Sequence, residues 1–291
     1  MFAPALLQTL LAVTETGSFD LAAARLGVTP SAISQRMRSL TELAGGPLLA
    51  RVQPAQPTAL GRRVMRHARD VATLEADLAA DLGQHGGPKP VSVAINADSL
   101  EAWAVPALAA APGFRFDITI VDQDQSVGLL RRGEVSAAIT SDATPAPGCD
   151  VVPLGALAYV ACCTPAFHRT HFGQGVTADA LRVAPVLQFT ADDHLQTRWI
   201  RQVTSEDIHP PAHRIAAPGP FMEATRLGLG WGLNQQVSVA RDLRAGTLVE
   251  ILPDTGLSTP LYWQVSRTMK HSLVPLTDAM RVAARAVLCQ R

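Results

Sequence analysis

The sequence predicts an α+β chain of several domains: a small helical domain, one long helix, and a two-lobed α/β domain. Two short amphipathic helix patterns joined by a turn occupy residues 18–40. An apolar pattern of helical period runs from Thr58 to about Gln84. Beyond residue 90, short apolar strands alternate with helices, which is typical of a parallel sheet. The expected domains are 1–58, 59–87 and 91–291, the last with lobe I at 91–163 and 264–291 and lobe II at 164–263.

The size and composition of the chain fit this division. Its 291 residues are 47% apolar, which is enough for more than one sizeable core. No signal peptide is recognisable, and no apolar stretch reaches the roughly 18 residues that a membrane span needs. The cysteines at 149, 162, 163 and 289 show no metal-ligand spacing. We therefore expect a cytoplasmic protein with buried, reduced thiols and with no metal or other cofactor.

The helices within residues 18–40 carry clear end signals. Ser18 is suited to cap the first helix and Gly27 to end it, while Thr29 and Pro30 are suited to begin the second. The apolar residues of the second helix recur at helical spacing and are expected to face inward: Ile33, Met37, Leu40 and Leu43. Near its start, side chains that suit base edges and phosphates are expected to face outward: Pro30, Ser31, Ser34, Gln35, Arg36 and Arg38. This is the pattern of a helix-turn-helix that reads double-stranded DNA.

The charge distribution supports DNA binding over the alternative of two ordinary surface helices. Residues 25–69 contain eight arginines and a single acidic residue, Glu42. The remaining residues carry 17 basic and 24 acidic side chains, although the whole chain is neutral. Positive charge gathered on one module indicates that this module binds a polyanion.

Three runs in this region are specific enough to indicate a family: AAARLGVTPSAISQRMRSL at 22–40, PLLAR at 47–51 and TALG at 58–61. They resemble the winged helix-turn-helix of LysR-type transcriptional regulators. The resemblance implies a wing at about 45–57, with Arg51 as its arginine, and implies that Pro30, Ser31, Ser34 and Gln35 read the groove. Thr41 and Leu49 depart from the family pattern, which usually has Glu and Phe there, and both positions concern packing more than readout.

The long helix is expected to join two chains. At 1.5 Å per residue it would be roughly 40 Å long, which is more than a domain of some 60 residues can bury. Packing onto its own domain is the alternative. Because a helix-turn-helix normally reads two half-sites as a two-fold dimer, a homodimer is favoured, and the resemblance adds pairing of dimers into a homotetramer. The expected seam contains Leu60, Val64, Val71 and Leu78.

The region beyond residue 90 divides into two sets of strands and helices. In the first set, strands are expected at 91–95, 116–121, 137–140 and 151–154, with helices at 99–110 and 124–133. In the second, strands are expected at 157–163, 186–189, 213–216, 230–233 and 247–251, with helices at 178–182, 193–202, 220–228 and 236–244. A strand at 261–265 and a helix at 273–288 close the chain. Two such lobes sharing two crossovers resemble periplasmic binding proteins, with a cleft between the lobes.

Polar residues follow three of these strands, at the edge where parallel sheets bind ligands. They are Asn96–Ser99, Asp122–Asp124 and Thr140–Asp142. Each Asp alone is better explained as a helix N-cap than as a ligand contact, but the three together favour a cationic ligand. Ser99, Thr140 and the N–H groups at the start of the 99–110 helix could hold a carboxylate. A small-molecule effector with one carboxylate and two amino groups, a basic amino acid, would fit both features.

Further runs indicate a subgroup: INADSLEAW at 95–103, LLRRGEVSAAIT at 129–140, PxPGC at 145–149, RLGLGWGL at 226–233 and PLYWQVSR at 260–267. They resemble the arginine- and lysine-responsive LysR-type regulators, which control amino-acid export and related genes. The resemblance implies an effector site formed by Asp98, Ser99, Trp103, Asp122 and Thr140. Four aromatic residues could line the site or be ordinary core: Trp103, Phe189, Phe221 and Trp231. Asn234-Gln235 stands where the subgroup usually has a proline, which leaves the contribution of lobe II open.

The sequence disfavours two other functions. An enzyme is disfavoured because His168 and His171 have no third ligand at a recognisable spacing and no nucleotide-binding or nucleophile signature occurs. A LysR-type regulator for an anionic or aromatic effector is disfavoured by the carboxylates at the strand ends. The expected partners are therefore DNA, a basic amino acid and further copies of the chain, without a membrane; contact with RNA polymerase is compatible with this class.

Overall fold

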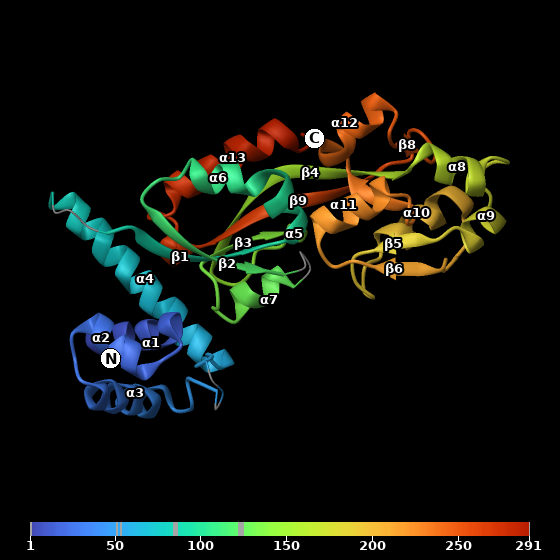
Figure 1. Cartoon of the computed structure of the whole chain (residues 1–291). Coiled ribbons are helices and arrows are strands. Elements are labelled where there is room, and N and C mark those ends of the chain that lie inside the picture. The colour runs from blue at the N-terminus through green and yellow to red at the C-terminus, as the bar shows by residue number, and fades with distance from the viewer. Residues whose placement is uncertain (1, 51, 53, 84–86, 122–124, 291) are drawn as a thin grey trace.

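The computed structural model describes residues 2–50, 52, 54–83, 87–121 and 125–290. Figure 1 shows a small helical N-terminal domain, the long helix α4, and an elongated α/β domain of two lobes. None of the helices formed by these residues combines the length and apolar character that crossing a membrane requires.

The N-terminal domain is a three-helix unit whose ends follow the capping signals. Its helices are α1 (Pro4–Thr16), α2 (Phe19–Leu26) and α3 (Pro30–Ala44). The Ser18 hydroxyl accepts from the Leu21 N–H, the Thr29 hydroxyl accepts from the Ala32 N–H, and Gly27 is left-handed with φ of 64°. Ile33, Met37 and Leu40 are buried as expected. Leu43 was expected inside but is 56% exposed, because the last turn of α3 extends past the core.

A short antiparallel pair follows α3 at the expected wing. Leu49 forms a β-bridge with Pro57, and the Ala50 N–H donates to the carbonyl of Gln56 at 2.8 Å. The wing lies tightly against the start of the next helix, since a Cβ on Gly61 would come within 2.0 Å of the Leu48 carbonyl oxygen. Arg51, the predicted wing arginine, is outside the described residues.

Helix α4 (Ala59–Asp81) has two halves with different surroundings. Thr58 caps it, accepting from the Gly61 N–H at 3.0 Å. In the first half, Val64 is buried in the core of the N-terminal domain and Leu60 packs against that core, so both serve their own domain. In the second half Val71 is half-buried, while Leu74 is 44% exposed and Leu78 60% exposed; Leu82, directly after the helix, is 66% exposed.

Helix α4 also contacts lobe I, through polar groups. Ser136 donates to the carboxylate of Asp70, and burial raises the pKa of Asp70 although Arg66 and Ser136 act in the opposite direction. Because this interface contains hydrogen bonds and ion pairs instead of a large apolar surface, its geometry depends on each partner being in place. The contacts are Arg62–Glu134 (2.7 Å), Arg69–Ser92 (2.9 Å), Asp70–Ser136 (2.6 Å) and Thr73 with the Pro90 carbonyl (2.6 Å).

Lobe I contains the expected parallel strands. Strand β1 (Lys89–Ile95) pairs in parallel with β2 (Phe114–Ile120) and with β3 (Ala137–Thr140). Alternate residues of β1 face opposite sides: Val91, Val93 and Ile95 contact the main core, whereas Ser92 lies under α4. The helices of lobe I are α5 (Ala97–Ser99), the π-helical turn η1 (Leu100–Ala104), α6 (Val105–Ala109), α7 (Ser126–Arg131) and α13 (Val274–Val287). In Figure 1, α6 and α13 cover one face of the sheet, and α4 and α7 the other.

Two long antiparallel strands join the lobes. The separate strands expected at 151–154 and 157–163 form one strand, β4 (Cys149–Cys163), which pairs with β9 (Leu257–Ser266). The register shifts between Pro153 and Gly155, and Gly155 has φ of 122°, so the strand bends without breaking the ladder. The resulting sheet has the order β2-β1-β3-β9-β4-β7, with β8 also paired to β4, and so crosses both lobes.

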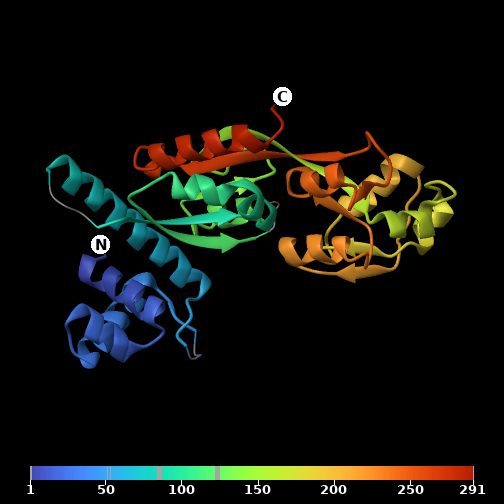
Figure 2. The same ribbon diagram turned by 45° about the horizontal axis from the view of Figure 1, so that its top comes forward.

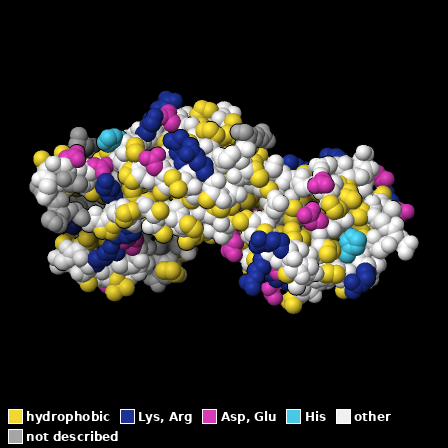
Figure 3. All heavy atoms as spheres, turned by 90° about the horizontal axis from the view of Figure 1, so that it is seen from above, with side chains coloured by type: hydrophobic (Ala, Val, Ile, Leu, Met, Phe, Trp, Pro, Cys, Tyr) yellow, Lys and Arg dark blue, Asp and Glu magenta, His cyan; other side chains and the backbone are white. Residues whose placement is uncertain are grey.

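Lobe II contains the second set of elements, and its centre is a pair of buried indoles. Trp199 and Trp231 are fully buried, with ring centroids 5.1 Å apart. Helix α8 (Pro165–Phe172) was not predicted from the sequence. The other elements are α9 (Ala178–Val183), β5 (Val186–Gln188), α10 (Leu195–Thr204), β6 (Ala212–Arg214), α11 (Pro218–Arg226), β7 (Gly232–Gln235), α12 (Gln236–Ala245) and β8 (Val249–Glu250). Figure 2 shows β4 and β9 passing from lobe I into this lobe, and Figure 3 shows a narrower waist between the two masses.

The cysteines only partly follow the expectation of buried thiols. Cys149, Cys162 and Cys163 are buried, and burial raises the pKa of Cys162 and of Cys163 to about 12. Cys289 is exposed because it lies beyond the end of the closing helix.

The exposed leucines of α4 predict that two chains pair through this helix. Changing Leu74 and Leu78 together to Asp should turn a dimer into a monomer at micromolar concentration, because carboxylates would then face an apolar partner. Light scattering measures the mass, and circular dichroism checks that the helices persist. Leu43→Asp, at an exposed leucine outside α4, is the control and should leave the mass unchanged. A wild-type protein that is a stable monomer would contradict the prediction.

Candidate functional site

The outward face of α3 presents the polar residues that the sequence indicated. Pro30, Ser31, Ser34, Gln35 and Arg38 are exposed, and Arg36 is half-buried. They lie in the first turns of the helix, and their inward neighbours Ile33 and Met37 fix α3 to the core. The face can therefore approach a DNA groove without disturbing the packing of the domain.

A cavity of about 470 Å³ lies between the two lobes. Lobe I and the crossing strand contribute Asn96, Ala97, Asp98, Glu101, Gln125 and Tyr159. Lobe II contributes Phe189, Thr190, Asp192, Asp193, His194, Leu195, Gln196, Arg198, Pro218, Phe221, Met222, Leu233, Asn234, Gln235 and Ser238. The size suits a small ligand held between the two lobes.

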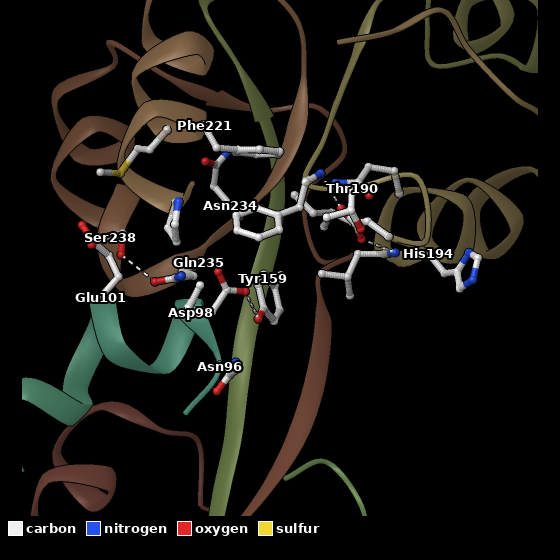
Figure 4. Close-up of a pocket in the computed structure, with 18 of the residues that line it drawn as sticks. Asn96, Asp98, Glu101, Tyr159, Thr190, His194, Phe221, Asn234, Gln235 and Ser238 are labelled. Carbon is white, nitrogen blue, oxygen red and sulfur yellow. Dashed lines mark hydrogen bonds between the residues drawn. The ribbon is translucent and has the colours of Figure 1, made fainter. Parts of the chain in front are cut away.

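The carboxylate of Asp98 is held by the crossing strand. The Tyr159 hydroxyl, from β4, donates to Asp98 Oδ2 at 2.5 Å (Figure 4). Burial raises the pKa of Tyr159 well above 10, and the charge of Asp98 raises it further. Tyr159 therefore stays a hydrogen-bond donor at neutral pH and fixes the direction of the Asp98 carboxylate.

Acidic groups outnumber basic ones around the cavity. Its lining includes four carboxylates and two side chains that can carry positive charge, His194 and Arg198. Asp193 accepts from the backbone N–H groups of Phe189 (2.9 Å) and Leu195 (3.0 Å), which holds it at the start of α10. The carboxylates are Asp98, Glu101, Asp192 and Asp193. This balance favours a ligand with net positive charge.

Two amide oxygens in the lining lack a donor among the described residues. Asn96 is 6% exposed and Gln196 is 2% exposed, and neither Asn96 Oδ1 nor Gln196 Oε1 has a hydrogen-bond partner. They come from opposite lobes, since Asn96 directly follows β1 and Gln196 lies in the first turn of α10. Buried acceptors of this kind are costly unless a donor reaches them, so both can receive N–H groups of a ligand.

The residues predicted for the effector site do not all lie at the cavity. Asp98 lines it. Ser99 is outside the lining and fully buried, and its hydroxyl has no hydrogen-bond partner among the described residues. Asp122 is outside the described residues. Two further predicted residues are also outside the lining: Trp103 is in the core of lobe I, and Thr140 is engaged with Gln264 (3.2 Å) and the Asp142 carbonyl (3.0 Å).

The aromatic residues divide in the same way. Phe189 and Phe221 line the cavity, whereas Trp103 and Trp231 are fully buried core residues. The periodicity of the sequence cannot tell an aromatic residue of the cavity from one of the core, because each of the four lies in an apolar run that faces the interior.

The Asn234-Gln235 pair takes part in the lining from lobe II. The Asn234 amide donates to Thr225 at 3.1 Å, and the Gln235 carbonyl oxygen accepts from Ser238 at 3.0 Å. Figure 4 shows Gln235 beside Asp98, and Asn234 between Gln235 and Phe221. Lobe II therefore forms its wall here with amides where the subgroup pattern has a proline.

Tyr159 and Gln196 were missed by the sequence analysis. Tyr159 occupies the middle of an apolar strand, and Gln196 is an ordinary polar residue of an amphipathic helix. No local signal marks either residue; only the packing of the lobes brings them to one cavity.

Comparison with known proteins defines the class of protein. Residues 4–62 match the model of the bacterial regulatory helix-turn-helix proteins of the lysR family, and residues 90–285 match that of the LysR substrate binding domain. The chain is thus a DNA-binding transcriptional regulator with an effector-binding domain. It belongs to the LysR family.

The chain matches known transcriptional regulators over nearly their whole length. The chain is 38% identical over 280 residues to LysG of Mycobacterium tuberculosis, covering 96% of this chain and 92% of that protein. It is 36% identical over 288 residues to the lysine export regulator LysG of Corynebacterium glutamicum, covering 97% of each.

Solved structures agree with these relatives. ArgP of M. tuberculosis aligns over 100% of both chains, with a TM-score of 0.83 and 36% identity. LysG of C. glutamicum with the bound effector Arg aligns over 99% of both, with a TM-score of 0.69 and 35% identity.

The buried Tyr159 predicts how stability falls in alkali. Its folded pKa is raised above the unfolded value of about 10, so its contribution is complete below about pH 10 and is lost as pH rises toward the folded pKa. Urea denaturation at pH 8, 10 and 11 should show a smaller alkaline loss of unfolding free energy for Tyr159→Phe than for wild type. Tyr262→Phe, at the chain's other tyrosine, is the control. Equal losses in wild type and Tyr159→Phe would show that Tyr159 does not titrate as described.

Proposed function

We propose that this LysR-family regulator senses a basic amino acid, lysine or arginine, in the cavity between its lobes, and controls genes of amino-acid export or metabolism. The observation that carries the proposal is the excess of carboxylates over cationic groups in a cavity of amino-acid size. The names of its relatives support it, since they include a lysine export regulator and a LysG structure with bound Arg. It acts where chromosomal DNA lies, in the cytoplasm, as a homodimer or homotetramer.

The main-chain end of the effector binds in lobe I. Its α-ammonium lies near Asp98, with Asn96 as a second acceptor. Its α-carboxylate takes the N–H groups at the start of the α5–η1 segment and the Ser99 hydroxyl, which has no partner among the described residues. Thr140 has no part, because its hydroxyl is already bonded within lobe I.

Calorimetry on wild type and Asp98→Asn tests this function. Wild type should bind lysine or arginine and should not bind glutamate or benzoate. Asp98→Asn should bind the basic amino acid ten- to about a hundredfold more weakly, because a charge-assisted hydrogen bond contributes about 1.5–3 kcal/mol. Asp142→Asn, at an exposed carboxylate of lobe I outside the cavity, should bind like wild type. Binding of glutamate or benzoate in preference to the basic amino acids would contradict the proposal.

DNA readout by α3 is tested separately. Gln35→Ala should relax the preference at one base pair, at a cost of about 1–3 kcal/mol there, because a bidentate amide contact with a base is lost. Arg51→Ala should weaken binding to all sequences alike and flatten the dependence on salt, as expected for a phosphate contact. Titrations of matched and mismatched DNA at several salt concentrations measure both effects. DNA binding that ignores both substitutions would refute the assignment of the reading helix and the wing.

A further inference from the structure

The strongest unexplained group in the cavity is the side-chain carbonyl of Gln196. Gln196 is the second residue of α10, is 2% exposed and lines the cavity, and its Oε1 has no partner among the described residues. An amphipathic surface helix gains nothing from a buried oxygen without a donor. The stability of lobe II therefore gives no reason for this oxygen, whereas a ligand that donates to it does.

The position of Gln196 decides which end of an effector it meets. The groups proposed above for the main-chain end all belong to lobe I: Asn96, Asp98 and Ser99. Gln196 lies on the opposite wall, in lobe II, with Asp192 and Asp193 just before it in the chain. An extended amino acid anchored in lobe I has only its side-chain head left to reach this wall.

We infer that Gln196 is the specificity-determining residue for the side-chain head, and that the head's N–H donating to Gln196 Oε1 ties lobe II to an effector held by lobe I. The inference rests on the proposed function. The nearby carboxylates supply charge, which any cation would satisfy, whereas the Gln196 carbonyl supplies a directed acceptor that requires a hydrogen-bond donor, which the head of a basic amino acid provides as an N–H group. Amino acids of equal length without a nitrogen at the end of the side chain leave this oxygen unpaired and are rejected.

The test uses the full-length protein and the substitution Gln196→Met, which keeps the size and shape of the side chain and removes the carbonyl. Calorimetry measures the affinities for arginine and lysine, and competition against arginine measures the affinity for norleucine, which is lysine without its terminal nitrogen. Gln196→Met should lose about tenfold or more in affinity for arginine and lysine, while norleucine changes little. Gln202→Met, the same change at an exposed position of α10, should match wild type.

A second measurement separates ligand recognition from a structural role. Because Gln196 Oε1 makes no hydrogen bond to any described residue of the chain, ligand-free Gln196→Met should melt at the wild-type temperature or above it, while the rise in melting temperature on adding arginine becomes smaller. A lower melting temperature of the free variant, with the arginine-induced rise intact, would overturn the inference. So would wild-type affinity of Gln196→Met for both basic amino acids. If wild type binds neither amino acid, the proposed function itself fails, which is a distinguishable result.

Discussion

The pairing of β4 with β9 fixes where an effector can bind. These antiparallel strands run from lobe I into lobe II, so the lobes share one sheet and are not joined by a loose linker. The ladder stays continuous through the register shift at Pro153 and Gly155. Tyr159 projects from β4 at the cavity and holds Asp98 of lobe I at 2.5 Å. The crossing strand thus orients the acidic wall of the cavity.

Lobe I connects this cavity to the DNA-binding module. Strand β1 ends at the cavity with Asn96 following it, and its Ser92 contacts Arg69 of α4 on the other face of the sheet. Helix α4 contacts lobe I through hydrogen bonds and ion pairs. A small shift of lobe I therefore changes the length of specific polar contacts with α4. Glu134 illustrates this: burial opposes its ionisation, yet hydrogen bonds from Arg132 and Arg62 outweigh burial and lower its pKa. Such an interface has defined partners that effector binding can make or break.

Local patterns predicted much of this molecule because local chemistry decides them. Ser18, Gly27 and Thr29 set helix ends through their own backbone and side-chain geometry, and the structure confirms all three. Long-range packing decided the rest. The two strands predicted at 151–154 and 157–163 form the single strand β4. Gly155 permits a bend within it, and in the sequence a glycine at this point looks like the end of a strand. Trp103 is a core residue and Gln196 a cavity residue, although periodicity gives both the same kind of helical position. Asp98 could be predicted as a cavity residue because ligands of parallel sheets bind at the carboxyl ends of the strands. Its partner Tyr159 could not be predicted, because their contact depends on how strand β4 packs beside lobe I.

A crystal structure of this chain grown with arginine would show whether a basic amino acid bridges the two lobes. We expect arginine between the lobes, with its main-chain end at Asp98 and Ser99 and its guanidinium within hydrogen-bond distance of Gln196 Oε1. Arginine bound outside the cavity, or held by one lobe with no contact to the other, would contradict this expectation.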